Sequence, residues 1–208
     1  MERQGAGLVV RRLEPGEPQA ERLVPLLAGL MAETGESFSV LHRIAVSIGP
    51  GRFSGVRTGV AAARGIGLAA GVPVVGATSF RIMAEAFEKS GDAPATYGLA
   101  APAGQTAVFC QILGRGCLPL TEIVALPHAE LAAFFKPAEA LSGPSALTLS
   151  QGGFISSPVR DPDLTPDASI LAELAPRLDP QRDVPSPFYV RPADARPQDG
   201  HIIARKKD

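Results

Sequence analysis

The chain has 208 residues, enough for one mid-sized domain or two small lobes that bury a core of their own. Apolar residues make up 45% of it and charged residues 20%, a balance typical of globular proteins and not of disordered ones. The formal net charge of −1 argues against non-specific binding of nucleic acid, and no apolar run is long enough to span a membrane.

Strands and helices are predicted to alternate through the first half of the chain, which favours a mainly parallel sheet with crossover helices. The first helix should carry its leucines on one stripe, with Pro25 in its first turns. A Ser-Gly-Asp-Ala-Pro stretch at 90–94 marks the predicted boundary between lobes 1–94 and 95–208. The expected strands are 8–13, 44–48 and 72–77, and the expected helices are 21–33, 54–70 and 79–88, the last capped by Thr78 or Ser79.

The second half is predicted to contain two further strands and two further helices. Strands are expected at 106–113 and 121–126, and helices at 128–135 and 167–178, with Pro127 at the first position of the earlier helix. Prolines dominate from residue 183 onward, which predicts a tail that follows the surface without regular structure.

Cysteines and histidines indicate neither a redox pair nor a metal site. Cys110 and Cys117 have neither the CxxC spacing nor a zinc-ligand spacing, and the three histidines are scattered along the sequence. Residues 1–7 lack the apolar core of a signal peptide. We therefore expect a reduced, cytoplasmic protein without a metal or a cofactor.

The segment between the strand at 44–48 and the helix at 54–70 carries the strongest signal. Its glycines allow a sharp turn, and the helix that follows presents backbone N–H groups that favour anions. The spacing GxGxxxG matches neither the dinucleotide fingerprint nor a P-loop, and the serine stands one position too late for a GxSxG nucleophile. Ser54 is therefore predicted to be a helix N-cap. The loop motif consists of Gly49, Pro50, Gly51, Phe53, Ser54 and Gly55.

Charge and side-chain size leave two questions open in this region. No Asp or Glu occurs from residue 37 to residue 84, yet Arg57 falls in the first helical turn, where a cation opposes the helix dipole by roughly 0.3–1 kcal/mol. Either an anionic partner group or an acidic residue from elsewhere in the fold is expected to offset it. The helix at 54–70 is also rich in glycine and alanine, which indicates close packing either within the lobe or against a second protein.

The run IAVSIGPGRFSGVRTGVAAARGIGLAAGVPVVGATS at 44–79 resembles the signature of the TsaB (YeaZ) family. The likeness is specific in Gly-Pro-Gly, in Phe-Ser-Gly, in Arg57 and Gly59, and in the basic residue followed by glycine at 64–65. AERLVP at 20–25 and the C-terminal FYVR and DARP are similar to further family motifs. The resemblance extends over residues 8–198.

This resemblance implies a two-lobed actin-like ATPase fold of the ribonuclease H-like class, without catalytic residues of its own. It implies a non-catalytic scaffold that binds the catalytic subunit TsaD and acts with the ATPase TsaE in threonylcarbamoyladenosine synthesis on tRNA. A homodimer through a similar surface is also implied, with tRNA reached only through the complex. Older descriptions place the superfamily among glycoproteases of the peptidase M22 type. The residues predicted to bind the partner are Glu21, Leu23, Leu27, Arg57, Gly59, Ala63 and Gly67.

Several departures from the family pattern keep other functions open. The chain has no HxxxH helix of the TsaD type, and the second-lobe motif DARRGEVY is replaced by APAGQT at 101–106. Arg52 stands where the family has serine, and Ser54 where it has threonine. A stand-alone adaptor of the same fold is one alternative, and a nucleotide-binding ATPase or glycoprotease-like enzyme is another.

The family pattern also opens with two strands that this sequence lacks, since MERQGAG at 1–7 cannot form an apolar strand. We therefore expect an incomplete first lobe and a truncated reading of a longer protein, with strand edges left open. Alternatively, strands 8–13 and 44–48 pair directly and in parallel through a right-handed crossover.

Overall fold

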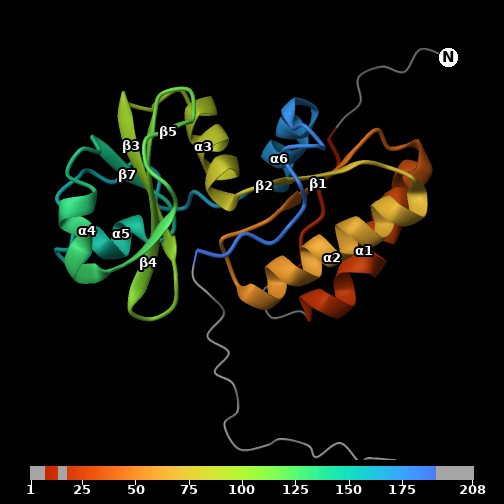
Figure 1. Cartoon of the computed structure of the whole chain (residues 1–208), viewed down its shortest axis with the longest axis horizontal. Coiled ribbons are helices and arrows are strands. Elements are labelled where there is room, and N and C mark those ends of the chain that lie inside the picture. The colour runs from red at the N-terminus through yellow and green to blue at the C-terminus, as the bar shows by residue number, and fades with distance from the viewer. Residues whose placement is uncertain (1–7, 14–17, 191–208) are drawn as a thin grey trace, which may run out of the picture.

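The computed structural model describes residues 8–13 and 18–190. Two groups of elements lie next to each other along the longest axis, with one helix between them (Figure 1). The helices are α1 (Gln19–Thr34), α2 (Phe53–Ala70), α3 (Ser79–Lys89), α4 (His128–Phe134), α5 (Ala146–Gln151) and α6 (Ala168–Leu174), with short 3₁₀ turns at Phe38–Val40 and Ala175–Arg177. The strands are β1 (Ile44–Ser47), β2 (Val74–Ala77), β3 (Thr96–Pro102), β4 (Ala107–Gly114), β5 (Leu118–Pro119), β6 (Val124–Pro127) and β7 (Ala140–Ser142).

The first sheet consists of β1 and β2, which pair in parallel and are joined by α2 as a crossover helix. Its two faces are covered by different helices, because side chains alternate along a strand. On one face Val75 and Ala77 pack with Leu171, Leu174 and Leu178 of the α6 region. On the other face Val74 lies against α2. The predicted strands at 44–48 and 72–77 and the helix at 54–70 are confirmed.

Helix α1 lies beside α2 and contributes no residue to the buried clusters of the described chain. It ends at Gly35, whose φ of 70° gives the left-handed cap that glycine accepts most readily. The helix predicted at 21–33 is confirmed, with Pro25 inside its first turns as expected. Its leucines form the expected stripe and are only half-buried.

The predicted strand at 8–13 is wrong. This segment is extended but pairs with no strand among the described residues, and Leu8 is 57% exposed. Two ion pairs hold it instead, from Arg11 to Glu33 at the end of α1 and from Arg12 to Asp167 at the start of α6. Apolar residues at the start of the segment favoured a strand, but among the described residues the segment is tied to two helices by charged side chains and joins neither sheet.

The second sheet is mostly antiparallel, in the order β5-β4-β3-β7 with β6 also paired to β4. Only β3 and β7 run in parallel, so the expectation of a mainly parallel sheet holds for the first group of elements alone. The sheet is confirmed at 106–113 and in part at 121–126, while β3 was not predicted. Helices α4 and α5 cover one side of it (Figure 1), and the core there includes Leu131, Phe135 and Leu149.

Helix α3 lies between the two groups and contacts both. Its N-cap is Thr78, whose hydroxyl accepts a hydrogen bond from the Arg81 amide at 3.1 Å, as predicted. On the side of the second sheet, Phe87 meets the ring of Tyr97 edge-on. The predicted boundary at residue 94 stays a prediction, and α6, which follows it in the sequence, returns to pack beside β1.

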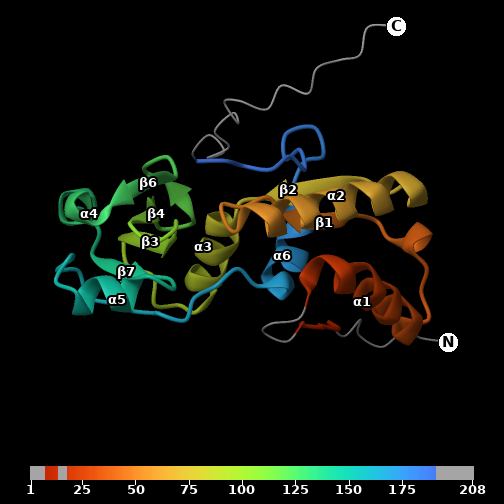
Figure 2. The ribbon, with the colours of Figure 1, turned by 90° about the horizontal axis from the view of Figure 1, so that it is seen from below.

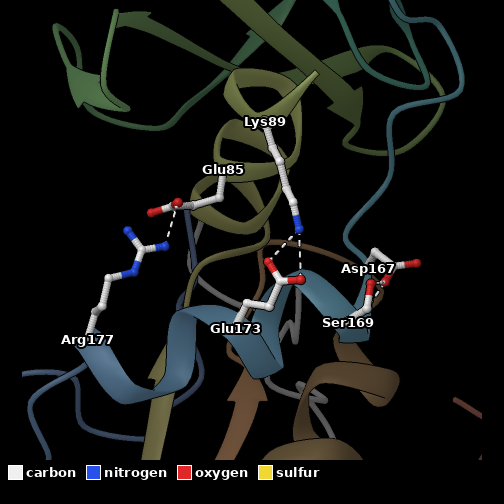
Figure 3. A network of polar contacts seen from close by, with 6 residues as sticks. All are labelled: Glu85, Lys89, Asp167, Ser169, Glu173 and Arg177. Carbon is white, nitrogen blue, oxygen red and sulfur yellow. Dashed lines mark hydrogen bonds and ion pairs between the residues drawn. The ribbon is translucent and has the colours of Figure 1, made fainter. Parts of the chain in front are cut away.

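Ion pairs join α3 to the α6 segment (Figure 3). Lys89 lies 2.7 Å from the carboxylate of Glu173, and Arg177 lies 2.6 Å from that of Glu85. The hydrogen bond from Arg177 to Glu85 raises the pKa of the guanidinium. These exposed pairs orient the two helices, while the apolar core beneath them supplies most of the stability.

Asp167 caps α6 and accepts hydrogen bonds from the backbone and hydroxyl of Ser169, which lower the pKa of the carboxyl group.

We expect Asp167→Ala to lower the free energy of unfolding by about 1 kcal/mol, because the first turn loses its acceptor. A carboxyl group with a lowered pKa contributes stability above its unfolded pKa and loses that contribution as the pH falls through its folded pKa. The difference between wild type and variant, measured by urea unfolding, should therefore shrink below about pH 4. Asp167→Asn keeps an acceptor and is the control; an equal loss of stability at every pH would contradict this role.

Candidate functional site

The glycine–proline loop connects β1 to α2 and is fastened to the start of α3. Gly49 has a φ of 95°, and its carbonyl oxygen accepts a hydrogen bond from the Ser79 amide at 2.8 Å. The hydroxyl of Ser79 donates to the carbonyl oxygen of Pro50 at 2.7 Å, and Ser79 is buried. The Gly49–Pro50 peptide bond is cis. The loop is therefore a fixed turn, held by groups that follow β2.

The segment at 183–189 covers the same loop from the other side. The amide of Phe188 donates to the carbonyl oxygen of Ile48 at 2.8 Å, and the amide of Gly76 donates to that of Asp183 at 2.8 Å. A side chain on Gly49 would lie 3.3 Å from the carbonyl oxygen of Phe188. This tail has no regular structure over 183–190, as predicted, but its backbone is bonded to β2 and to the residue that follows β1.

Arg57 in the first turns of α2 is held by two aromatic rings. Its guanidinium carbon lies 3.9 Å from the ring centre of Phe53, and its Nε donates to the hydroxyl of Tyr189 at 2.8 Å. The rings of Phe53 and Tyr189 are 5.3 Å apart. Cation–π contacts of this kind are worth about 0.5–1 kcal/mol at exposed sites, comparable to the cost of placing a cation there. The sequence favoured an anion or an acidic residue, and within the described chain Arg57 has this aromatic pair instead.

Ser54 is not the N-cap of α2. The cap position belongs to Arg52, whose side chain makes no capping hydrogen bond, and the helix begins at Phe53. Because Ser54 already has helical geometry, its hydroxyl lies beside the first turn and not ahead of the free N–H groups. Phe53, Ser54 and Gly55 are exposed.

A groove of about 600 Å³ lies between the start of α2 and the start of α1. Sequence-predicted residues from the two helices meet here, although they are far apart in the chain. From α1 these are Glu21 and Leu23, and from α2 and its loop they are Ser54, Gly55 and Gly59.

The remaining predicted partner-binding residues do not share that surface. Ala63 and Gly67 are buried, and a side chain on Gly67 would lie 2.2 Å from Cγ2 of Val74. They pack within the chain, one of the two roles that the small residues of this helix left open. Leu27 is half-buried and Arg57 is exposed.

Sequence reasoning missed Leu68, which is 88% exposed on α2. Next to it, a side chain on Gly65 would meet no described residue outside the helix's own backbone within 4 Å, and Ala61 and Ala69 are exposed. Arg64, one turn before Leu68, is exposed as well, so the outward face combines small residues with one leucine and one arginine. The sequence did contain a signal, because Leu68 does not fall on the stripe formed by the buried positions of this helix.

Two cysteines and one tyrosine in or beside the second sheet have raised pKa values, which keep them in their less reactive protonated form. Burial raises the pKa of the Cys110 thiol to about 12 and that of the Cys117 thiol to about 11. Burial also raises the pKa of Tyr97, and the neighbouring Cys117 and Glu88 side chains raise it further. No group of three or more His, Cys, Asp or Glu side chains in residues 8–13 and 18–190 is arranged to hold a metal ion. In the same part of the chain, no helix is long and apolar enough to cross a membrane.

Comparison with known proteins relates the chain to one group. The model of the family described as TsaD, tRNA N6-adenosine threonylcarbamoyltransferase, matches residues 17–156. The tRNA threonylcarbamoyladenosine biosynthesis protein TsaB of Escherichia coli is 35% identical over 72 residues, which are 34% of this chain and 31% of that protein. A tRNA N6-adenosine threonylcarbamoyltransferase of Erythrobacter litoralis is 41% identical over 56 residues, 27% of this chain and 16% of that protein. The chain thus spans less than a third of the length of either relative.

A solved structure has the same fold. It is an uncharacterized protein with similarity to peptidase YeaZ from Pseudomonas aeruginosa, with a TM-score of 0.70 and 22% sequence identity. The superposition covers 84% of this chain and 85% of that one. The mixed α/β arrangement of the chain is therefore that of the YeaZ structures.

Proposed function

We propose, on the premise that this chain belongs to the TsaD–TsaB (YeaZ) family, that it is a non-catalytic subunit in the synthesis of threonylcarbamoyladenosine on tRNA. Its role is to bind and support a catalytic subunit of the TsaD type, with TsaE as a further partner and the cytoplasm as its location. The same membership supports an actin-like, ribonuclease H-like fold of two lobes.

The observation that carries the proposal is the exposed face of α2. Leu68 is 88% exposed there, with the small residues Ala61 and Gly65 and the exposed Arg64 on the same side, so a partner helix can approach the small residues and meet both an apolar and a basic side chain. A second surface lies at the other end of the helix, where the groove between the starts of α1 and α2 is lined by Glu21, Leu23 and Gly59. Accordingly, we assign partner binding to the exposed residues of α1 and α2, with Arg57 at the edge.

The chemistry of the loop supports an accessory role over a catalytic one. The residues from 37 to 84 contain no carboxylate that could act as a general base or hold a metal with a nucleotide. Arg57 is engaged by Phe53 and Tyr189, and the loop backbone is bonded to Ser79 and Phe188. These contacts fit a rigid support for a protein interface.

We expect Leu68→Asp to abolish binding to the TsaD protein of the same organism, because a desolvated carboxylate would replace an apolar contact. Isothermal titration calorimetry with purified proteins measures the loss. The matched control is Leu118→Asp on β5, an equally drastic change at a side chain that is 58% exposed in the other sheet. Wild-type affinity of the folded Leu68→Asp variant would place the interface elsewhere, and no binding by the unaltered chain would contradict the proposed function.

A further inference from the structure

The guanidinium group of Arg57 is fixed in place while two of its nitrogens stay open. Its central carbon lies 3.9 Å from the ring centre of Phe53, and its Nε donates to the hydroxyl of Tyr189 at 2.8 Å. Among the described residues, the two terminal nitrogens have no hydrogen-bond or ion-pair partner. A guanidinium binds a carboxylate through two parallel hydrogen bonds, and one that is already held loses less conformational freedom on binding. Arg57 is therefore prepared for an oxyanion that the described chain does not supply.

Arg57 belongs to a row of exposed residues along α2, which we call the basic stripe. Its members follow one another at three- and four-residue spacing and so share one face of the helix. They are Phe53, Arg57, Ala61, Arg64 and Leu68, and all five are exposed. Helix α2 contains no Asp or Glu, and Arg64 has no acidic partner in the described part of the chain. The stripe therefore presents two positive charges and one large apolar side chain.

The basic stripe lies on the flank of α2 that faces away from α1. The residues of α2 that line the groove toward α1 are on another side of the helix: Ser54, Gly55, Thr58 and Gly59. Figure 2 shows α1 on one side of α2 and the last described segment, in blue, on the other. Tyr189 belongs to that segment and reaches Arg57. The exposure of the stripe thus does not depend on α1 or on the segment at 8–13.

We propose that the basic stripe binds an acidic amphipathic helix of the catalytic subunit, with carboxylates seven residues apart. This inference rests on the proposed function and adds the chemistry of the partner to it. Arg57 and Arg64 are separated by about 10 Å along the helix axis, a spacing that acidic residues at i and i+7 of a second helix match. One carboxylate accepts hydrogen bonds from both terminal nitrogens of Arg57. The small Ala61 between the arginines lets the helices approach, and Leu68 packs against the apolar side of the partner helix.

Two other occupants fit the stripe less well. A second copy of α2 brings two further arginines and no carboxylate that could neutralise them. The phosphates of tRNA would satisfy Arg57 and Arg64, but they would leave Leu68 against a charged backbone, and the whole chain has a net charge of −1. An acidic amphipathic helix satisfies both the arginines and the leucine.

The test measures binding of the full chain to the TsaD protein of the same organism by isothermal titration calorimetry. We expect the affinity of the unaltered chain to fall between about 50 mM and about 300 mM NaCl, because salt screens the ion pairs. Arg57→Glu and Arg64→Glu should each weaken binding at least about tenfold, since like charges then meet. A glutamate at position 57 is favourable near the start of a helix, so this variant should stay folded, which circular dichroism checks. Arg160→Glu is the matched control, at an exposed arginine outside α2.

Charge reversal in the partner separates a direct contact from a structural role of Arg57. Single Glu→Arg and Asp→Arg substitutions on surface helices of the TsaD protein are measured against Arg57→Glu. We expect one of them to restore at least about tenfold of the lost affinity, and to weaken binding of the unaltered chain by a similar factor. A merely structural role of the arginine would give no such rescue.

The outcomes separate this inference from the proposed function. If the unaltered chain binds TsaD and both charge-reversed variants bind equally well, the inference is wrong while the proposed function stands. If the unaltered chain does not bind, the proposed function fails and the inference fails with it. Self-association or tRNA binding that Arg57→Glu abolishes, while TsaD binding persists, would assign the stripe to a second copy or to nucleic acid and overturn the inference.

Discussion

Gly67→Ala is expected to destabilise the protein, although alanine is the better helix former. An added Cβ would lie 2.2 Å from Cγ2 of Val74 and 2.9 Å from the carbonyl oxygen of Val72, distances at which atoms must move. The valine side chain is stiff and the carbonyl belongs to the backbone, so α2 has to shift away from β2. Overpacking of this kind costs about 1–3 kcal/mol in the free energy of unfolding.

Gly65→Ala in the same helix is the matched control, with the opposite sign expected. No described residue outside the helix's own backbone lies within 4 Å of its added Cβ, so the substitution only restricts the unfolded chain and favours the helix. We expect a gain of about 0.5–1 kcal/mol, measured beside Gly67→Ala by chemical denaturation. If both variants were stabilised, the close contact between α2 and β2 would be contradicted.

Leu174→Ala is expected to have the largest effect on stability. Leu174 is fully buried in the cluster that joins α6 to Val75 and Ala77 of the first sheet. Loss of a buried leucine leaves a cavity and costs about 2–5 kcal/mol. The melting temperature and the urea concentration at the unfolding midpoint should both fall, and the amide hydrogens of β1 should exchange faster.

Leu147→Ala on α5 separates this effect from a general loss of apolar surface. Its side chain is 46% exposed, so the change should stay within about 0.5 kcal/mol. Similar losses for the two variants would mean that α6 is not a structural part of the first sheet.

The sequence predicted best the elements whose residues interact locally. The helix at 54–70 shows its period and its terminal glycine, and Thr78 stands where a cap is needed, so both were recognised. Strand β3 was missed because apolar and polar residues do not alternate along its Tyr-Gly-Leu-Ala-Ala-Pro run. The run is buried because α3 and β4 pack around it. The segment at 8–13 has the composition of a strand, but ion pairs to α1 and α6 hold it, and it pairs with no strand of the described chain.

The candidate site was predictable in its residues but not in its contacts. The glycine–proline loop and Arg57 are evident from their spacing and charge. Their partners are Ser79, Phe188 and Tyr189, which follow much later in the chain, and nothing local in the sequence links them. The exposure of Leu68 likewise depends on which side of α2 the sheet occupies.

Residues near the end of the described chain cover the first sheet, and this affects the order in which the protein folds. The elements α1, β1, α2 and β2 leave the ribosome first, yet the face of β2 is buried by Leu174 and Leu178, and the loop after β1 is closed by Phe188. Contacts so distant in sequence slow the search for the native state. The second sheet pairs β3 with β4 across a short turn, although Phe188 and Val190 also pack against its cluster around Tyr97. During synthesis, the pairing of β3 with β4 can therefore form before the first sheet acquires the residues that bury it.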